Sequence, residues 1–160
     1  MKLLIISDTH TDSIDKLPVI ITDEAAKCDG IIHAGDIVSY KLIHDLMHIN
    51  PNVYAVRGNM DPNLGDDRLP LTRKIELDGV RIGISHGSGN PYGIENRLLY
   101  TFQDVDLIIY GHTHKPFWGM IGGVHFLNPG SPTNKRTEPH HTYAILTIEK
   151  GIFDAEIKRV

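Results

Sequence analysis

The chain has 160 residues, of which 41% are hydrophobic and 22% are charged, proportions typical of a globular protein with a sizeable core. This length predicts a single domain over residues 1–160. The formal net charge of −4 argues against a dedicated nucleic-acid binder, because phosphate backbones are held mainly by Lys and Arg. One cysteine beside ten histidines excludes an internal disulfide framework and cysteine-based metal sites.

Membrane and secretory signals are missing from the sequence pattern. No apolar run reaches the length of about 18 residues that a membrane span needs. The first residues, MKLLIISD, turn acidic too early for a secretory signal peptide. The sequence therefore predicts a cytoplasmic protein with no membrane partner.

The first third of the chain alternates between short apolar runs and longer mixed stretches. Strands are predicted at residues 2–6, 30–34 and 52–56, with helices near 15–26 and 40–48 between them. This β-α-β-α-β order is typical of right-handed crossovers on a largely parallel sheet.

The remainder of the chain favours antiparallel hairpins. Residues 72–77 and 80–85 alternate around Asp78-Gly79, a strong signal for a two-residue turn. A helix near 92–103 leads into a strand at 107–110. Further strand pairs are predicted at 117–121 with 124–127 and at 142–148 with 152–158. Two sheets packed face to face, with helices outside, accommodate both parts of the chain.

Five of the predicted strands end in side chains that bind metals. The residues concerned are Asp8, His10, Asp36, Asn59, His86, His112 and His114. In open α/β sheets ligands bind outside the carboxyl ends of the strands, so these side chains are expected at one edge. The glycines beside them permit a sharp turn or a close backbone approach; they are Gly35, Gly58, Gly87 and Gly111.

Each of these residues taken singly has an ordinary structural explanation. Asp36 and Asn59 suit turn or capping roles, and a lone His86 suits a hydrogen-bonded loop residue. Such explanations would have to hold together at five strand ends. The pairs at positions 8/10 and 112/114 also have no common turn explanation. We therefore predict that the seven side chains bind metal.

The donor set contains nitrogen and oxygen atoms but no thiolate. Four imidazoles favour Zn, Fe, Ni, Co and, less strongly, Mn over Mg or Ca. Seven ligands are too many for one such ion, but they suit two ions that share a bridging carboxylate. Two divalent ions keep a net charge after the two carboxylates bind, which attracts an anion such as phosphate and acidifies a bridging water.

In order and spacing these motifs resemble the calcineurin-like metallophosphoesterases, and most closely their small bacterial and archaeal phosphodiesterases. The resemblance covers about residues 1–148. It rests on Asp8-x-His10, Gly35-Asp36, Gly58-Asn59, His86 and Gly111-His112-x-His114, and extends to the turn Asn128-Pro129-Gly130-Ser131. It implies a four-layer α/β/β/α sandwich of two mixed sheets flanked by helices.

The resemblance also implies a role for each ligand. Asp8, His10 and His114 would hold one ion, Asn59, His86 and His112 would hold the second, and Asp36 would bridge them. Asp36, Asn59 and His86 would form the catalytic set, with a hydroxide between the two ions attacking phosphorus. The expected metal is Mn²⁺, with Zn²⁺, Fe²⁺, Ni²⁺ or Co²⁺ as alternatives. The expected partner is a small-molecule phosphate ester, and the expected assembly is a homodimer.

Two positions depart from the family pattern. Met60 stands where many members have a His that helps to protonate the leaving oxygen, so esters with good leaving groups are expected to react faster. Asp61 is expected to orient Asn59 or a water instead. Ser39 replaces a second Asp that usually follows the Gly35-Asp36 motif, which weakens the support of the ligands without removing one.

Two other functions stay open. The same site can cleave phosphomonoesters, and some proteins of this fold, including a subunit of an endosomal sorting coat, act as non-catalytic scaffolds. A scaffold need not keep seven metal ligands, which disfavours that reading here.

The remaining histidines are interpreted mainly as structural residues. His44 and His48 suit an exposed helix face, His125 a hairpin strand and His140-His141 a loop, whereas His33 suits either a structural or a supporting role near Asp36. The glycine-rich residues 87–93 lack the Gly-x-Gly-x-x-Gly spacing, which argues against a dinucleotide site.

Overall fold

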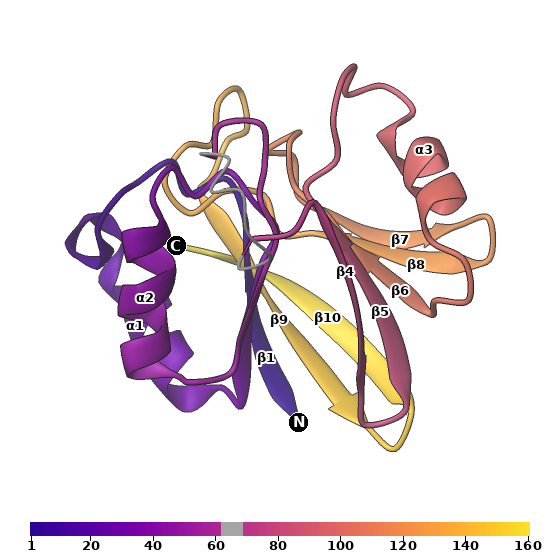
Figure 1. Cartoon of the computed structure of the whole chain (residues 1–160), viewed down its shortest axis with the longest axis horizontal. Coiled ribbons are helices and arrows are strands. Elements are labelled where there is room, and N and C mark those ends of the chain that lie inside the picture. The colour runs from indigo at the N-terminus through magenta and orange to yellow at the C-terminus, as the bar shows by residue number, and fades with distance from the viewer. Residues whose placement is uncertain (62–68) are drawn as a thin grey trace.

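The computed structural model describes residues 1–61 and 69–160, which form two five-stranded sheets with helices outside them (Figure 1). The first sheet has the strand order β10-β9-β1-β2-β3. Its strands are β1 (Lys2–Ile6), β2 (Gly30–His33), β3 (Val53–Ala55), β9 (Thr142–Glu149) and β10 (Ile152–Arg159). The second has the order β4-β5-β6-β8-β7. Its strands are β4 (Thr72–Leu77), β5 (Val80–Ser85), β6 (Leu107–Ile109), β7 (Phe117–Ile121) and β8 (Val124–Asn128).

Both sheets are mixed, as predicted. The strands β1, β2 and β3 are parallel, as are β5, β6 and β8, whereas the hairpin partners β4, β7, β9 and β10 pair antiparallel. The C-terminal hairpin β9–β10 joins the first sheet beside β1, where Leu3 lies opposite Leu146. The last strands of the chain therefore complete the sheet that the first strands begin.

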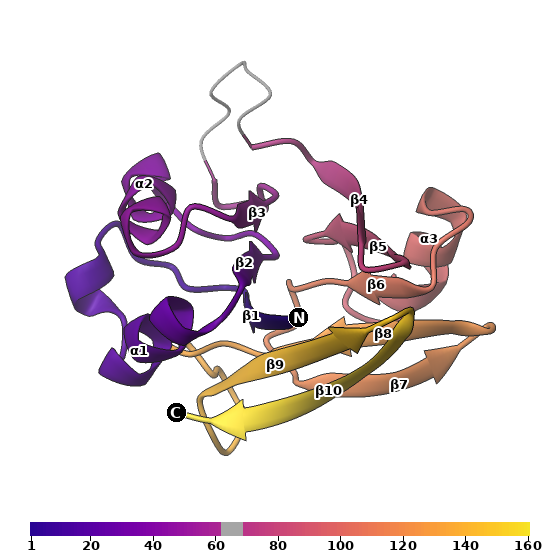
Figure 2. The ribbon, with the colours of Figure 1, turned by 90° about the horizontal axis from the view of Figure 1, so that it is seen from below.

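Three apolar layers separate the four layers of the sandwich. Alternate residues of β1 point to opposite faces, so Leu3 and Ile5 pack between the two sheets while Leu4 and Ile6 pack under helices. The helices α1 (Val19–Lys27) and α2 (Tyr40–Ile49) cover the first sheet, and α3 (Ile94–Thr101) covers the second. Figure 2 shows this order of helices, sheet, sheet and helix, which confirms the predicted α/β/β/α fold.

Two predicted helices differ from the observed ones. The stretch 15–26 divides into a short 3-10 helix, η1 (Ile14–Lys16), and α1, because Pro18 favours an extended conformation at Leu17. The stretch 92–103 shortens to α3, because Gly93 before it is left-handed at φ 71°. No helix of the described ranges is long and apolar enough to cross a membrane.

Candidate metal centre

The seven predicted ligands lie on the loops that leave five strands at one edge of the two sheets. Asp8 and His10 follow β1, Asp36 follows β2, and Asn59 follows β3. His86 follows β5, while His112 and His114 follow β6. Because β1, β2 and β3 are parallel, and β5 and β6 are parallel, each sheet brings its strand ends together. This edge lies at the upper end of the sheets in Figure 1.

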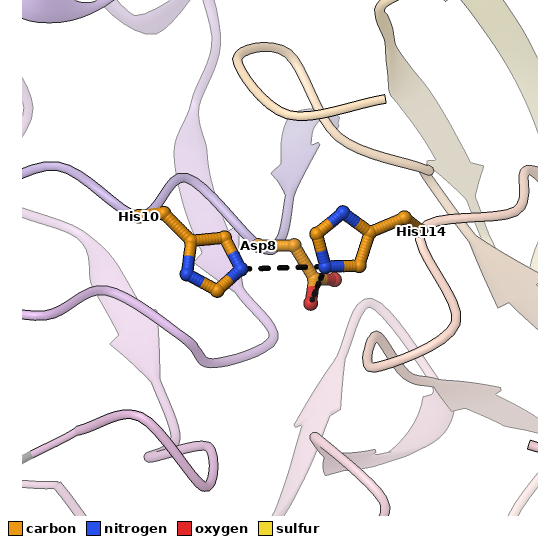
Figure 3. Close-up of side chains that lie close together, drawn as sticks. All are labelled: Asp8, His10 and His114. Carbon is orange, nitrogen blue, oxygen red and sulfur yellow. Dashed lines mark hydrogen bonds and ion pairs between the residues drawn. The ribbon is translucent and has the colours of Figure 1, made fainter. Parts of the chain in front are cut away.

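Asp8, His10 and His114 form the first cluster (Figure 3). The Nε2 atom of His114 lies 3.1 Å from Asp8 Oδ1 and 3.3 Å from Nε2 of His10. One potential ligand atom from each residue lies within 4.8 Å of the others. Asp8 and His114 are buried and His10 is half-buried, so the cluster sits at the bottom of the loops with one side toward solvent.

Asp8, Asp36 and His86 form the second cluster, in which all three residues are buried. His86 Nε2 lies 3.3 Å from Asp36 Oδ1 and 3.8 Å from Asp8 Oδ1. The other oxygen of Asp36, Oδ2, lies 3.6 Å from His10 Nε2. The two oxygens of Asp36 thus face different clusters, which is the arrangement a bridging carboxylate requires.

His112 and Asn59 lie beside the second cluster. His112 Nδ1 is 3.1 Å from Asn59 Oδ1, and the ring of His112 stands edge-on to that of His86 with centroids 5.3 Å apart. The backbone N–H of His112 donates to Asp8 Oδ2 at 3.1 Å. Five of the seven predicted ligands thus form the two clusters, and Asn59 and His112 pair with each other beside the second.

Three backbone carbonyls determine which histidine nitrogens are free. His86 Nδ1 lies 2.8 Å from Ala34 O, His114 Nδ1 contacts Asn134 O, and His112 Nε2 lies 2.8 Å from Gly89 O. A carbonyl only accepts, so each of these nitrogens carries the proton. In the neutral rings the opposite nitrogen is bare. In His86 and His114 it points toward the carboxylates of the clusters, and in His112 it faces Asn59.

The bare atoms have no hydrogen-bond donor to satisfy them. Within the described residues, His86 Nε2 and Asp8 Oδ1 are buried polar atoms without a hydrogen-bond partner. Opposed lone pairs at these distances repel one another and carry a desolvation cost. A cation placed among them removes both penalties. The residues therefore fit the divalent metal ions that the donor types predict.

The charges of the two carboxylates support the same conclusion. Burial by itself would raise the pKa of Asp36, but the His86 ring 3.3 Å away, when protonated at Nε2, and the backbone N–H of Met60 outweigh burial and lower the pKa to about 2. Burial likewise opposes the ionisation of Asp8, yet the neighbouring His114 and His86 rings lower its pKa below the usual value. Both groups are anionic at neutral pH, and two buried anions favour cation binding.

The backbone bends sharply at most of the ligands. Asp8, His10, Asp36, His112 and His114 all have left-handed φ angles, between 44° and 69°. Residues other than glycine rarely adopt this conformation, and it clusters at functional sites. The bends occur at both members of the pairs 8/10 and 112/114; they bring Asp8 and His10 together in the first cluster, whereas His114 joins the first cluster and His112 lies beside the second.

Two glycines beside the ligands leave no room for a side chain. A Cβ added at Gly58 would lie 2.1 Å from Asp36 Oδ1, and one added at Gly111 would lie 2.0 Å from Ser7 Oγ. These contacts are far shorter than any van der Waals distance. The predicted close backbone approach is therefore confirmed at both positions.

Asp61 supports the centre in a way that the sequence did not indicate. Its Oδ1 accepts from the backbone N–H groups of Ile37 and Val38, both at 2.6 Å, and its Oδ2 accepts from Gly58 at 2.7 Å. These contacts tie the loop after β2 to the loop after β3. Asp61 thus holds in place the backbone that precedes Asn59, whereas the sequence had predicted that it orients the side chain of Asn59 or a water.

The turn at residues 128–131 supplies a second support. Ser131 Oγ donates to the carbonyl of Asp8 at 2.7 Å, and Asn128 Nδ2 donates to that of Gly111 at 3.0 Å. The turn therefore joins the loop after β1 to the loop after β6. The motif is visible in the sequence, but its contacts depend on the distant segments that it meets.

His33 is a buried support and not a ligand of either cluster. Its Nδ1 accepts from the N–H of Gly35 at 3.2 Å, so its Nε2 carries the proton and donates to Thr9 Oγ1 at 3.0 Å. His48 contacts the carbonyl of His44 within α2. Neither of those two helix residues belongs to a potential metal cluster among the described residues.

Comparison with known proteins agrees with this geometry. The model of the calcineurin-like phosphoesterase superfamily domain matches residues 1–151. A probable metallophosphoesterase of Methanothermobacter thermautotrophicus is 37% identical, over 99% of this chain and 92% of its own length. Phosphodiesterase MJ0936 of Methanocaldococcus jannaschii is 31% identical, over 99% of this chain and 95% of its own length.

Solved structures share the fold across the whole chain. The protein TM1076 of Thermotoga maritima has a TM-score of 0.79 and 34% identity, with 99% of both chains covered. Vps29 of Entamoeba histolytica, solved in complex with Zn²⁺, has a TM-score of 0.74 and 23% identity, over 100% of this chain and 98% of its own. The match to the family model covers nearly every residue from which the centre is built. The chain therefore belongs to the calcineurin-like phosphoesterase superfamily.

Proposed function

We propose that this metallophosphoesterase hydrolyses phosphodiesters with two divalent ions held by the seven clustered side chains. The observation that carries the proposal is the set of bare, mutually facing donor atoms, above all His86 Nε2 and Asp8 Oδ1. Asp8, His10 and His114 are proposed to hold one ion, and Asn59, His86 and His112 the other. Asp36, whose two oxygens face both clusters, is proposed to bridge them.

When bound, two such ions supply positive charge to the phosphoryl oxygens and lower the pKa of a water between them. The chain supplies their placement. Asp36, whose Oδ1 accepts from the backbone N–H of Met60 at 2.9 Å, is held rigidly between the clusters. His86 is fixed in one tautomer by Ala34 O, while Asn59 and His112 lie toward solvent, where the phosphate enters.

Proton donation to the leaving oxygen is the weak part of this site. The side chain of Met60 has no acidic proton, and both oxygens of Asp61 accept from backbone N–H groups. Neither residue can therefore act as general acid. The proposed substrates are small diesters whose leaving groups depart without one.

The identity of the metal is a proposal as well. Mixed imidazole and carboxylate donors bind Mn²⁺ or Zn²⁺ well, and we propose Mn²⁺ as the working metal. A cytoplasmic location and a homodimer stay predictions from the sequence.

A direct test combines metal titration with two chromogenic substrates. Metal-free protein, titrated calorimetrically with Mn²⁺, is expected to bind two ions. The loaded protein is expected to cleave bis(p-nitrophenyl) phosphate faster than p-nitrophenyl phosphate. Asp36→Asn is expected to lower the diesterase rate at least about a hundredfold. Asp154→Asn, on the distant strand β10, serves as the control and should leave the rate unchanged.

Each contrary outcome has a defined meaning. Binding of a single ion would overturn the binuclear assignment. Faster cleavage of the monoester would favour a phosphomonoesterase. Binding of two ions without hydrolysis of either ester would favour a scaffold role.

A further inference from the structure

Arg97 of α3 makes three contacts with the loop at residues 88–92, which precedes that helix. Its Nη1 donates to the carbonyl of Tyr92 at 3.1 Å, and its Nη2 donates to that of Ser88 at 3.0 Å and to that of Asn90. A guanidinium offers several donors in one rigid plane. A single side chain therefore gathers three carbonyls of one short loop.

The loop has little else to hold it. Residues 88–93 are all exposed, so no apolar packing fixes their position. A Cβ at Gly89 would meet no atom within 4 Å. Within the loop, the N–H of Tyr92 donates to Asn90 Oδ1 at 3.0 Å. Arg97 thus provides three hydrogen bonds that tie this loop to α3, beside the one that His112 makes to Gly89.

The carbonyl of Gly89, between two of the gathered carbonyls, is the group that accepts from His112 Nε2 at 2.8 Å. Asn59 Oδ1, which also can only accept, lies 3.1 Å from Nδ1, so the two acceptors compete for the single ring proton, and the shorter contact with Gly89 favours the proton on Nε2. Partners that fix a ligating histidine in this way orient the ring and raise its basicity as a ligand. Arg97, Gly89 and His112 therefore form a chain of contacts from α3 to the metal centre.

We propose that Arg97 is a positioning residue for the ion held by Asn59, His86 and His112. It acts through the loop at residues 88–92, by keeping the Gly89 carbonyl where it selects the tautomer and orientation of His112. The inference rests on the proposed function, because it takes His112 as a ligand.

The other ion should be insensitive to Arg97. His114 is fixed by the carbonyl of Asn134 and not by this loop. Asp8 is held by Ser7 Oγ, 2.7 Å from Asp8 Oδ2, by the turn at residues 128–131, and by the backbone N–H of His112 rather than its ring. Loss of Arg97 therefore weakens one ion site and spares its neighbour, whereas a general loss of stability would affect both.

The experiment measures each ion site alone. His10→Ala removes a ligand of the first ion, and Asn59→Ala removes a ligand of the second. Arg97→Ala is added to each, and Mn²⁺ affinity is measured calorimetrically on metal-free protein. In the His10→Ala background Arg97→Ala is expected to weaken binding about tenfold or more. In the Asn59→Ala background it is expected to leave the affinity unchanged.

Arg81→Ala is the matched control. Arg81 lies on β5 of the sheet that α3 covers. It pairs with Asp106 at 2.8 Å, and this pair lies away from the loop at residues 88–92. It should change neither affinity. Arg97→Lys, which keeps the charge but cannot reach three carbonyls at once, is expected to fall between wild type and Arg97→Ala. If Arg97→Ala does not fold, Arg97→Lys in the same two backgrounds carries the comparison.

A spectroscopic readout is independent of metal and activity. In metal-free protein, the ¹⁵N shifts of the His112 ring should report a protonated Nε2 in wild type and a mixture of tautomers in Arg97→Ala. An unchanged tautomer with unchanged affinities would overturn the proposal, as would equal weakening of both ions. If wild type binds two ions but cleaves no ester, the proposed function fails while the comparison at Arg97 can still be made.

Discussion

Several residues of the candidate metal centre have backbone conformations that are unfavourable for folding. A left-handed φ costs a residue with a Cβ about 1–2 kcal/mol, and five of the seven predicted ligands adopt one. In the metal-free protein, no bound ion offsets the free-energy cost of these conformations. The loops that carry the candidate ligands therefore lower the free energy of unfolding while they place these side chains close together, as is common at functional sites.

Substitution at His10, where φ is 44°, tests this cost. Both His10→Ala and His10→Gly remove the imidazole, but only glycine adopts the left-handed conformation without strain. In metal-free protein, His10→Gly is expected to exceed His10→Ala in free energy of unfolding by about 1 kcal/mol. Urea unfolding measures the difference, and an equally stable alanine variant would contradict it.

Met60 determines a second property at the residue scale. With no general acid at this position, the rate on a series of diesters should fall steeply as the leaving-group pKa rises. Met60→His is expected to flatten that dependence and to raise the rate on the poorest leaving group about tenfold. Met60→Gln, of similar size but without an acidic proton, is the control. A flat dependence in wild type would refute the reasoning.

At the scale of elements, side chains between the strand ends determine how the ligand loops are arranged. Asp61 joins the loops after β2 and β3, and His33 joins the loops after β1 and β2 through Thr9 and Gly35. The turn at residues 128–131 joins the loops after β1 and β6. These links are buried or half-buried hydrogen bonds, all to backbone except that of His33 with Thr9 Oγ1, so the loops hold one another in register.

His33 makes this arrangement sensitive to pH. Burial lowers its pKa to about 3, against about 6.5 in an unfolded chain. Between these values the unfolded chain binds a proton that the folded protein excludes, so stability falls as pH falls. The contribution is about 1.4 kcal/mol per pH unit. His33→Gln should lose this slope between pH 6 and pH 4 in urea unfolding of metal-free protein. Equal slopes in both proteins would show that His33 does not titrate on unfolding.

At the scale of the molecule, the candidate metal centre draws its residues from both sheets, which also meet through apolar packing and through hydrogen bonds such as those of Ser131 with Asp8 and Gly151 with Asp78. Asp8, His10, Asp36 and Asn59 come from the first sheet, whereas His86, His112 and His114 come from the second. An ion bound to the folded form alone stabilises it by mass action, by about 2.7 kcal/mol at a hundred times its Kd. Metal binding should therefore stabilise the pairing of the two sheets.

Thermal unfolding tests this coupling. Adding Mn²⁺ to metal-free protein is expected to raise Tm by several degrees, and EDTA should reverse the change. Asp36→Asn, which removes the proposed bridge, should show a much smaller rise. The control Asp154→Asn should behave like wild type. A Tm that does not respond to metal in wild type would contradict tight binding at this centre.

The sequence alone determined the elements, the ligand types and the edge where they gather, because these follow from local patterns and from the direction of parallel strands. Apolar alternation predicted both sheets and the outer helices, and the residues after each strand predicted a metal site. Pro18 and Gly93 explain the two helix boundaries that were misplaced, since each changes the backbone conformation locally.

Only the tertiary structure decided which segments far apart in the chain meet. Hydrogen bonds join the last hairpin to β1 and Asp61 to the backbone of two loops. They also link Arg97 through the loop at residues 88–92 to His112. Such contacts depend on the relative positions of whole elements, and many partners along the chain could satisfy the same donors equally well. Local sequence therefore carries the chemistry of this candidate centre, whereas packing determines the tautomers and orientations that the proposed metal binding requires.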